Sequence, residues 1–162
     1  MTPSLYRVFA DFDWLELEEN ARQSPRLRAH FNLHQSYDEP VQKTLICILK
    51  GSYIPPHFHR HAHQKELFLV LVGQVKVLFF DKDGTVKEIM VLGQGEMIEI
   101  LSYSIHTVVC LSSSAKILEV KQGPFIANDC KEFLEWTIPE NHKKSSSFLS
   151  WLERTQVGEK YV

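Results

Sequence analysis

Hydrophobic positions between residues 41 and 121 form short runs that recur at regular spacing, with polar or glycine-containing turns between them. The runs are rich in Val, Ile, Leu and Phe, which favour strands, and Asp83-Gly84 supplies a hairpin turn. Many short strands with tight turns indicate a sandwich or a barrel, because either arrangement hides the sheet edges. No strand–helix–strand alternation is present, which argues against a doubly wound fold. We expect strands at 45–49, 67–72, 75–80, 85–92, 96–101, 106–111 and 116–121.

The N-terminal region begins with a helical pattern. Asp13 followed by Glu16 has the spacing of a capping box, and a helix starting there would end before Pro25. The predicted apolar face of this helix consists of Leu15, Leu17 and Ala21.

Residues 26–34 alternate with a period of two, which predicts a strand with one apolar and one polar face. The apolar face would hold Leu27, Ala29, Phe31 and Leu33. The polar face would hold Arg28, His30, Asn32 and His34.

The C-terminal region is less rich in strand signals. Ser147 could cap a final helix, and the residues at 158–162 are expected to fray. The apolar face of that helix would hold Phe148, Trp151 and Leu152. At 162 residues, the length suits one domain that can bury a core without disulfides. We therefore expect a single all-β domain over 1–162, with an N-terminal helix and edge strand at 1–40, a barrel core at 41–125 and a C-terminal extension at 126–162.

Composition and charge narrow the classes of partner. The formal net charge is -2, which provides no basic field for nucleic acid or anionic lipid. No apolar stretch approaches the roughly 20 residues that span a bilayer, and the first residues do not form a signal peptide. The three cysteines are too few for a disulfide framework. We expect a cytoplasmic protein with no nucleic-acid or membrane partner.

A histidine cluster is the strongest chemical signal. Four of the eight histidines fall close together, at His57, His59, His61 and His63. Glu66 follows at the start of a predicted strand, and His106 begins a later one. Alternate residues of an extended segment point the same way, so His57 and His59 can face one point. Imidazole and carboxylate together suit one divalent transition metal ion such as Zn, Fe, Mn or Ni. The competing interpretation is a solvated polar loop.

The spacing around this cluster resembles the first cupin motif. That motif has the form G-x5-H-x-H-x3-4-E-x6-G, and here Gly51, His57, His59, Glu66 and Gly73 match its conserved types. The gap before Glu66 is two residues longer than usual. The resemblance implies that His57, His59 and Glu66 are metal ligands.

A second cupin motif, G-x5-P-x-G-x2-H-x3-N, is similar to the segment from Gly95 to His106. Leu101, Tyr103 and Cys110 replace its proline, second glycine and asparagine. The match adds His106 to the implied ligand set. Because of the longer gap before Glu66, two further histidines are substitute ligands, His61 and His63.

More closely, the chain resembles the WbuC family of cupin-fold metalloproteins. The matching stretches are 24–34, 51–59, 65–73 and 119–125. The resemblance implies a cupin-type double-stranded β-helix, or jelly-roll barrel, with a bound metal. Members lie among genes for surface-polysaccharide assembly in some bacteria, so a sugar-related small molecule is the expected ligand.

Other polar residues could bind that ligand, since Arg recognises carboxylate or phosphate well. The candidate substrate-binding residues are Arg26, Arg28, Asn32, His34, Tyr53 and Lys121. The leading hypothesis is a metal-dependent enzyme of unspecified reaction. A non-catalytic sugar or metal sensor and a metal-independent nucleotide-sugar isomerase or epimerase are the alternatives. Exposed sheet edges would also favour a homodimer.

Overall fold

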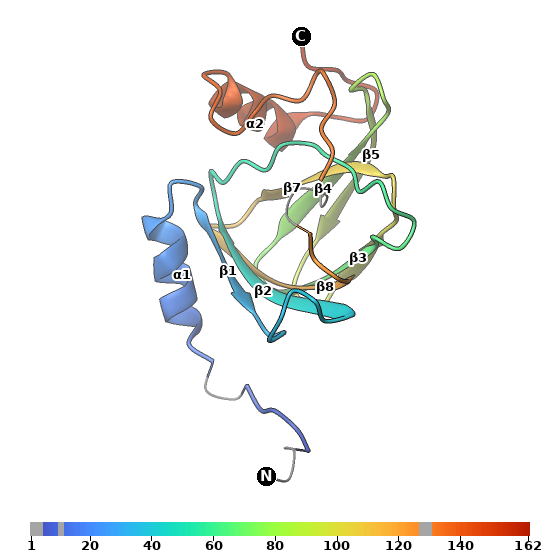
Figure 1. Cartoon of the computed structure of the whole chain (residues 1–162). Coiled ribbons are helices and arrows are strands. Elements are labelled where there is room, and N and C mark those ends of the chain that lie inside the picture. The colour runs from blue at the N-terminus through green and yellow to red at the C-terminus, as the bar shows by residue number, and fades with distance from the viewer. Residues whose placement is uncertain (1–4, 10–11, 127–130) are drawn as a thin grey trace.

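Two antiparallel sheets face each other and close into a barrel, with a helix at each end of the chain packed outside it (Figure 1). The computed structural model describes residues 5–9, 12–126 and 131–162. The larger sheet has the order β1-β2-β8-β3-β6 and the smaller sheet β5-β4-β7. The strands are β1 Arg28–Asn32, β2 Val41–Leu49, β3 Glu66–Val72, β4 Val75–Phe80, β5 Val86–Leu92, β6 Met97–Ile100, β7 Ile105–Cys110 and β8 Ser114–Gln122. The predicted all-β barrel with two short helices is confirmed.

The second half of strand β2, residues 45–49, is an unbroken apolar run. Ile46 and Ile48 pack into the core between the sheets, where they join residues such as Phe68 and Val108. The alternate residues of β2 point outward and are covered by the N-terminal helix. This half of the strand is buried on both faces and so has no position left for polar side chains, whereas Gln42, Lys43 and Thr44 occupy the first half.

Helix α1 (Trp14–Gln23) lies against β1 and β2. The Asp13 carboxylate caps it by accepting hydrogen bonds from the backbone N–H groups of Leu15 at 2.8 Å and Glu16 at 3.0 Å. Leu17 and Ala21 are buried, as expected from their i, i+4 spacing. The prediction that Leu15 shares this face is wrong, because its side chain is 78% exposed. Two residues along a helix turn through about 200°, which places Leu15 on the far side.

Helix α2 (Ser145–Arg154) packs on the outer face of the three-stranded sheet, where Phe148, Trp151 and Leu152 are buried as predicted. The N-cap prediction for Ser147 is wrong. The cap is Lys144, and Ser147 lies in the first turn, with its hydroxyl donating to the Lys144 carbonyl at 2.9 Å. The prediction therefore missed the helix start by three residues.

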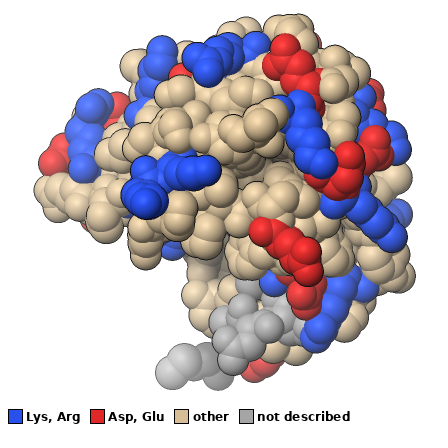
Figure 2. All heavy atoms as spheres, turned by 90° about the horizontal axis from the view of Figure 1, so that it is seen from above, with Lys and Arg blue, Asp and Glu red and all other residues tan. Residues whose placement is uncertain are grey.

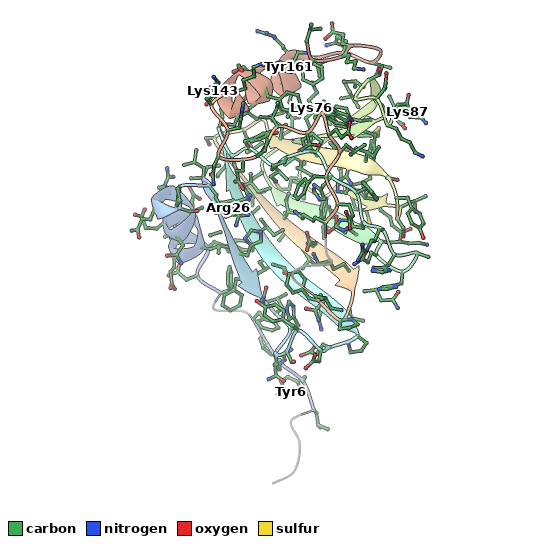
Figure 3. The ribbon with its side chains drawn as sticks, turned by 45° about the horizontal axis from the view of Figure 1, so that its top comes forward. Tyr6, Arg26, Lys76, Lys87, Lys143 and Tyr161 are labelled. Carbon is green, nitrogen blue, oxygen red and sulfur yellow. The ribbon has the colours of Figure 1, made fainter. Side chains whose placement is uncertain are left out.

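The C-terminal end of the chain is held against the barrel. The ring of Tyr161 packs edge-on against Phe148 at 4.7 Å between centroids, and the Gly158 N–H donates to the Val86 carbonyl at 2.8 Å. The Lys76 ammonium lies beneath α2 in the same part of the molecule and donates to three carbonyls at the helix end (Figure 3). The expected fraying of residues 158–162 is therefore wrong, because the apolar Tyr161 and the backbone bonds to Val86 fix the segment.

Neither helix in the described part of the chain has the length and apolar character that crossing a membrane requires. On the face seen from above, basic and acidic side chains are interspersed among neutral ones (Figure 2).

Candidate metal centre

Two of the histidines are fixed by direct backbone pairing across the barrel. The His57 N–H donates to the His106 carbonyl at 3.0 Å, and the His106 N–H donates back to the His57 carbonyl at 2.8 Å. His106 also belongs to β7, whose residues are all buried. The pairing brings two histidines that are far apart in sequence to one point inside the barrel.

Backbone carbonyls also select the tautomer of these two rings. The His57 Nδ1–H donates to the Pro55 carbonyl at 2.9 Å, and the His106 Nδ1–H donates to the Ser104 carbonyl at 2.9 Å. A ring that donates through Nδ1 keeps its lone pair on Nε2 when it is neutral. Both rings therefore offer Nε2 as a metal-ligating atom, held in orientation by a hydrogen bond to the other nitrogen.

Glu66, the first residue of β3, brings a carboxylate to the same point. Its Oε2 lies 3.0 Å from His59 Nε2 and 3.4 Å from His106 Nε2, and its Oε1 lies 3.5 Å from Lys121 Nζ. Burial acts to raise the pKa of Glu66, but the adjacent rings of His106 and His59 and the charge of Lys121 hold it well below its usual range. Glu66 is therefore a carboxylate, the form that binds metal.

The four residues form one buried group. His57, His59, Glu66 and His106 are 3%, 4%, 3% and 1% exposed, and their potential ligand atoms all lie within 4.8 Å of one another. Burial lowers the pKa of His57 well below its usual value, as do the nearby Lys131 and His106. No described residue makes a hydrogen bond to the buried His57 Nε2. A neutral imidazole with an unused, buried lone pair beside a carboxylate fits a divalent metal ion.

The long gap before Glu66 is absorbed by turns. The Gln64 N–H donates to the His61 carbonyl at 2.9 Å, and the Lys65 N–H donates to the His63 carbonyl at 2.9 Å. The rings of His61 and His63 stack on each other at 5.6 Å, 13° from parallel, and His63 is exposed. These two histidines, predicted as substitute ligands, lie outside the four-residue group.

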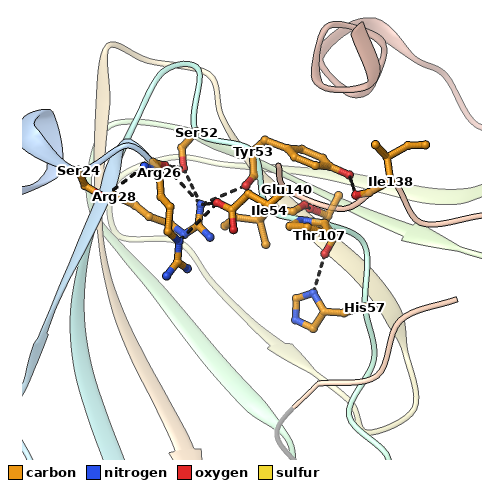
Figure 4. A network of polar contacts seen from close by, with 11 residues as sticks. Ser24, Arg26, Arg28, Ser52, Tyr53, Ile54, His57, Thr107, Ile138 and Glu140 are labelled. Carbon is orange, nitrogen blue, oxygen red and sulfur yellow. Dashed lines mark hydrogen bonds and ion pairs between the residues drawn. The ribbon is translucent and has the colours of Figure 1, made fainter. Parts of the chain in front are cut away.

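The segment that carries His57 is held by side chains from both directions (Figure 4). From one side, the Arg28 guanidinium donates to the Tyr53 carbonyl at 3.0 Å and pairs with Glu140 at 2.7 Å. From the other, the Thr107 hydroxyl donates to the Ile54 carbonyl. These bonds fix the backbone immediately before the metal centre.

Cavities lead from the four-residue group toward the surface. A narrow cavity of about 70 Å³ is lined by His57, Glu66 and His106, with the apolar barrel core as its floor. A larger cavity of about 560 Å³ also reaches Glu66, and its walls are largely polar. The side of the centre away from the core is therefore open to a small molecule.

The predicted substrate-binding residues divide into three groups. Four of them line the polar cavity of about 560 Å³: Arg26, Asn32, His34 and Lys121. Arg28 lines the narrow cavity, but its guanidinium is occupied by the contacts described above. Tyr53 lines none of the described cavities, since it is 6% exposed and its hydroxyl donates to the Ile138 carbonyl at 2.7 Å. The structure places Tyr53 against α2, away from the histidines, so its expected ligand contact is wrong.

Sequence reasoning missed several residues of the cavity walls. Gln42 and Thr44 project into the polar cavity from β2, and Glu119 does so beside Lys121 from β8. The period of two along each strand could have found these residues. Lys131 and Glu140 come from a segment without such a pattern, so no signal marked them. The sequence placed His30 on the polar face, and it lines the polar cavity. Partial burial, together with the charges of Arg28 and Arg26, lowers the pKa of its ring to about 4.

A family model described as a domain of unknown function, DUF6016, matches residues 11–92. The search of curated proteins found no relative.

Similar solved structures include a variant oxalate decarboxylase from Bacillus subtilis, with 20% identity and a TM-score of 0.51 over 65% of this chain and 27% of that chain. An oxalate decarboxylase formate complex from Lactobacillus farciminis has 17% identity and a TM-score of 0.51 over 67% and 31%. A cupin superfamily protein from Desulfitobacterium hafniense has 19% identity and a TM-score of 0.48 over 59% and 76%. At these identities the two matches with TM-scores above 0.5 show the fold alone, a cupin-type jelly roll.

Proposed function

We propose that the chain, which belongs to the DUF6016 family, a domain of unknown function, is a metal-dependent cupin enzyme. Its proposed substrate is a small, polar, sugar-related anion. The observation that carries the metal assignment is the four-residue group itself. Three imidazoles and one carboxylate are buried together, and backbone carbonyls hold two of the rings with Nε2 as the ligating atom.

The proposed metal ligands are His57, His59, Glu66 and His106. Three nitrogens and one oxygen suit Zn, Fe, Mn or Ni, and a bound divalent ion supplies a Lewis acid that polarises oxygen groups and lowers the pKa of water. The apolar barrel core excludes water below the centre, whereas the cavities above it leave room for a ligand.

Charge around the polar cavity supports an anionic ligand. Arg26, Lys121 and Lys131 line it, together with His30, whose pKa of about 4 leaves its ring uncharged at neutral pH. Two carboxylates also line the cavity and offset part of this charge, since Glu119 lies 3.0 Å and Glu66 lies 3.5 Å from Lys121 Nζ, which leaves Arg26 and Lys131 as the excess. A cavity with several basic groups attracts an anion and orients it toward the metal centre.

Two buried polar atoms support a hydroxylated ligand. His34 Nδ1 lies 2.9 Å from the Lys43 carbonyl oxygen and 3.1 Å from the Lys43 nitrogen, so the Lys43 backbone occupies this side of the ring, and the Gln42 amide group donates to the Glu39 carbonyl at 2.8 Å. The remaining atoms, His34 Nε2 and Gln42 Oε1, have no hydrogen-bond partner in the described part of the chain. Since both residues line the polar cavity, hydroxyl groups of a sugar-like molecule, which both donate and accept hydrogen bonds, could pair with these two atoms.

The WbuC resemblance supports the finer part of the proposal, a role in surface-polysaccharide biosynthesis. Three of its four matching stretches, 24–34, 51–59 and 65–73, lie within the part that the family model matches. A homodimer is part of the same proposal, because β1 and β6 end the larger sheet and Met97 of β6 is 60% exposed.

The test uses untagged protein, because a histidine tag would bind metal itself. Elemental analysis is expected to give about one divalent ion per chain, and a panel of sugar acids and nucleotide sugars is expected to include one that is turned over. Lys121→Met should weaken the binding of that compound, whereas the control Lys87→Met, on the exposed outer side of β5, should not. Turnover without metal would favour the isomerase alternative, and tight binding without turnover would favour the sensor.

A further inference from the structure

A second large cavity, distinct from the polar one, adjoins the metal centre. It has a volume of about 490 Å³, and most of its walls are apolar. The apolar lining residues are Ile54, Pro55, Phe133, Leu134 and Pro139. We refer to it as the apolar cavity.

The apolar cavity lies directly beside the metal ligand His57. Ile54 and Pro55 lie three and two residues before His57 in the chain, and the ring of Phe133 lies 6.3 Å from the His57 ring between centroids. The Thr137 hydroxyl donates to the Pro56 carbonyl at 3.0 Å, so the two walls are joined by a buried hydrogen bond. The cavity is therefore bounded by fixed backbone next to the reacting centre.

Phe133 leaves apolar area uncovered at this position. Its side chain is 57% exposed although it is one of the largest apolar residues. Exposed aromatic surface beside a cavity is typical of a ligand site, because a bound nonpolar group removes that surface from water.

Two basic residues connect the apolar cavity to the others. Arg26 and Lys131 line the apolar cavity, the narrow cavity at the metal centre and the polar cavity. Arg26 precedes β1 (Figure 3), and its side chain is 53% exposed. Arg26 Nε lies 3.4 Å from Glu140 Oε1, and the same oxygen lies closer to Arg28 Nη1, at 2.7 Å. A charged group of a ligand at this junction would meet Arg26 and Lys131 while the rest of the ligand extended into either large cavity.

We propose that the apolar cavity is a subsite for a nonpolar acyl or aryl group of an organic anion, whose charged group lies between Arg26 and Lys131 at the mouth of the metal centre. The inference rests on the proposed function for the role of the centre, but it concerns a different part of the ligand. It narrows the substrate class from a polar anion to an anion with a nonpolar substituent.

Binding of three simple probes tests the proposal: acetate, phenylacetate and the uncharged phenylacetamide, titrated against the full chain by calorimetry or NMR. Phenylacetate is expected to bind at least about tenfold more tightly than acetate, because the phenyl ring removes apolar area from water. Phenylacetamide should bind at least about tenfold more weakly than phenylacetate, because it lacks the charge that Arg26 and Lys131 attract. Equal affinities for acetate and phenylacetate would overturn the proposal.

Variants locate the effect in the cavity. Phe133→Ala should remove most of the preference for phenylacetate and leave acetate binding unchanged. The matched control Val91→Ala, on β5 and 46% exposed, lines none of the three cavities and should retain the preference. Loss of the preference in both variants, or in neither, would contradict the assignment.

Metal analysis of the same samples separates the two proposals. A preference for phenylacetate in protein that binds no metal would support the subsite and contradict the proposed function. One metal per chain without that preference would leave the proposed function standing and overturn the subsite.

Discussion

Two pairs of histidines, only a few residues apart, have opposite environments. His57 and His59 are buried beside Glu66, whereas His61 and His63 stack on each other in the loop beyond them. The difference lies in the backbone. His57 pairs with His106 across the barrel, and the His59 carbonyl accepts the Tyr103 N–H at 2.9 Å, whereas the carbonyls of His61 and His63 accept bonds from within their own loop.

The contrast shows that residue type alone does not make a metal site. All four residues carry the same imidazole, but only two are held by strands and segments that converge inside the barrel. A ligand needs a fixed orientation and a second nitrogen that is occupied by a hydrogen bond, which His57 has through the Pro55 carbonyl. The predictions below test this contrast, from the largest expected effect to the smallest.

Alanine substitutions of the buried histidines and of the loop histidines should have opposite effects on the metal content. His57→Ala and His106→Ala remove two of the proposed buried ligands and should reduce the metal content from about one ion per chain to near zero. His61→Ala and His63→Ala are the matched controls and should keep the full content. Elemental analysis after dialysis measures this, and full content in His57→Ala would refute the ligand assignment.

Glu66→Gln tests the carboxylate while keeping the size of the side chain. Because the amide carries no negative charge, metal affinity should fall at least about a hundredfold. Competition with a chelator of known affinity measures the change. Glu99→Gln, on β6 beside it and not part of the group, is the control. An unchanged affinity in Glu66→Gln would show that another residue completes the site.

Arg28→Met tests the support behind His57. The change removes the Glu140 ion pair and the bond to the Tyr53 carbonyl inside a buried segment, so the free energy of unfolding should fall by about 2–3 kcal/mol. Arg26→Met is the matched control, since its exposed side chain should contribute no more than about 1 kcal/mol. Urea denaturation measures both, and equal losses would mean that the Arg28 contacts do not hold the segment.

Acid should destabilise the metal-free protein before its carboxylates titrate. The pKa of His57 is lowered in the folded state, so below about pH 6.5 the unfolded chain takes up a proton that the folded chain does not. This histidine therefore contributes stability above that pH, and the contribution falls by up to about 1.4 kcal/mol per pH unit as the pH decreases. Lowering of the Glu66 pKa adds a loss only below about pH 4.5.

Unfolding midpoints of chelator-treated protein between pH 7.5 and 5 measure this loss. In His57→Gln the dependence on pH should be weaker, whereas the exposed-loop variant His63→Gln should behave like the wild type. A wild-type curve that is flat over this interval would contradict a buried neutral His57.

Much of the barrel could be predicted from the sequence, because local alternation and turn residues act over a few positions. The alternation of residues 26–34 correctly separated Arg28, Asn32 and His34, which line cavities, from Leu27 and Ala29, which pack beneath α1. The spacing of Gly51, His57 and His59 likewise predicted that two of the histidines face one point, and the structure places them together.

Features that depend on contacts between distant segments could not be predicted in this way. Tyr53 resembles a pocket residue in sequence, but the Ile138 carbonyl and Phe148 bind it on the other side. The Arg28–Glu140 pair joins residues from opposite ends of the chain, and no local pattern marks either partner. The same holds for the closing segment, where the packing of Tyr161 depends on α2.

Anomalous diffraction from crystals of the untagged protein, recorded at the absorption edge of the metal found by elemental analysis, tests the central claim most directly. The account predicts one peak per chain, within bonding distance of Nε2 of His57, His59 and His106 and of the Glu66 carboxylate. A peak at the stacked rings of His61 and His63, or no peak among the four buried residues, would contradict it.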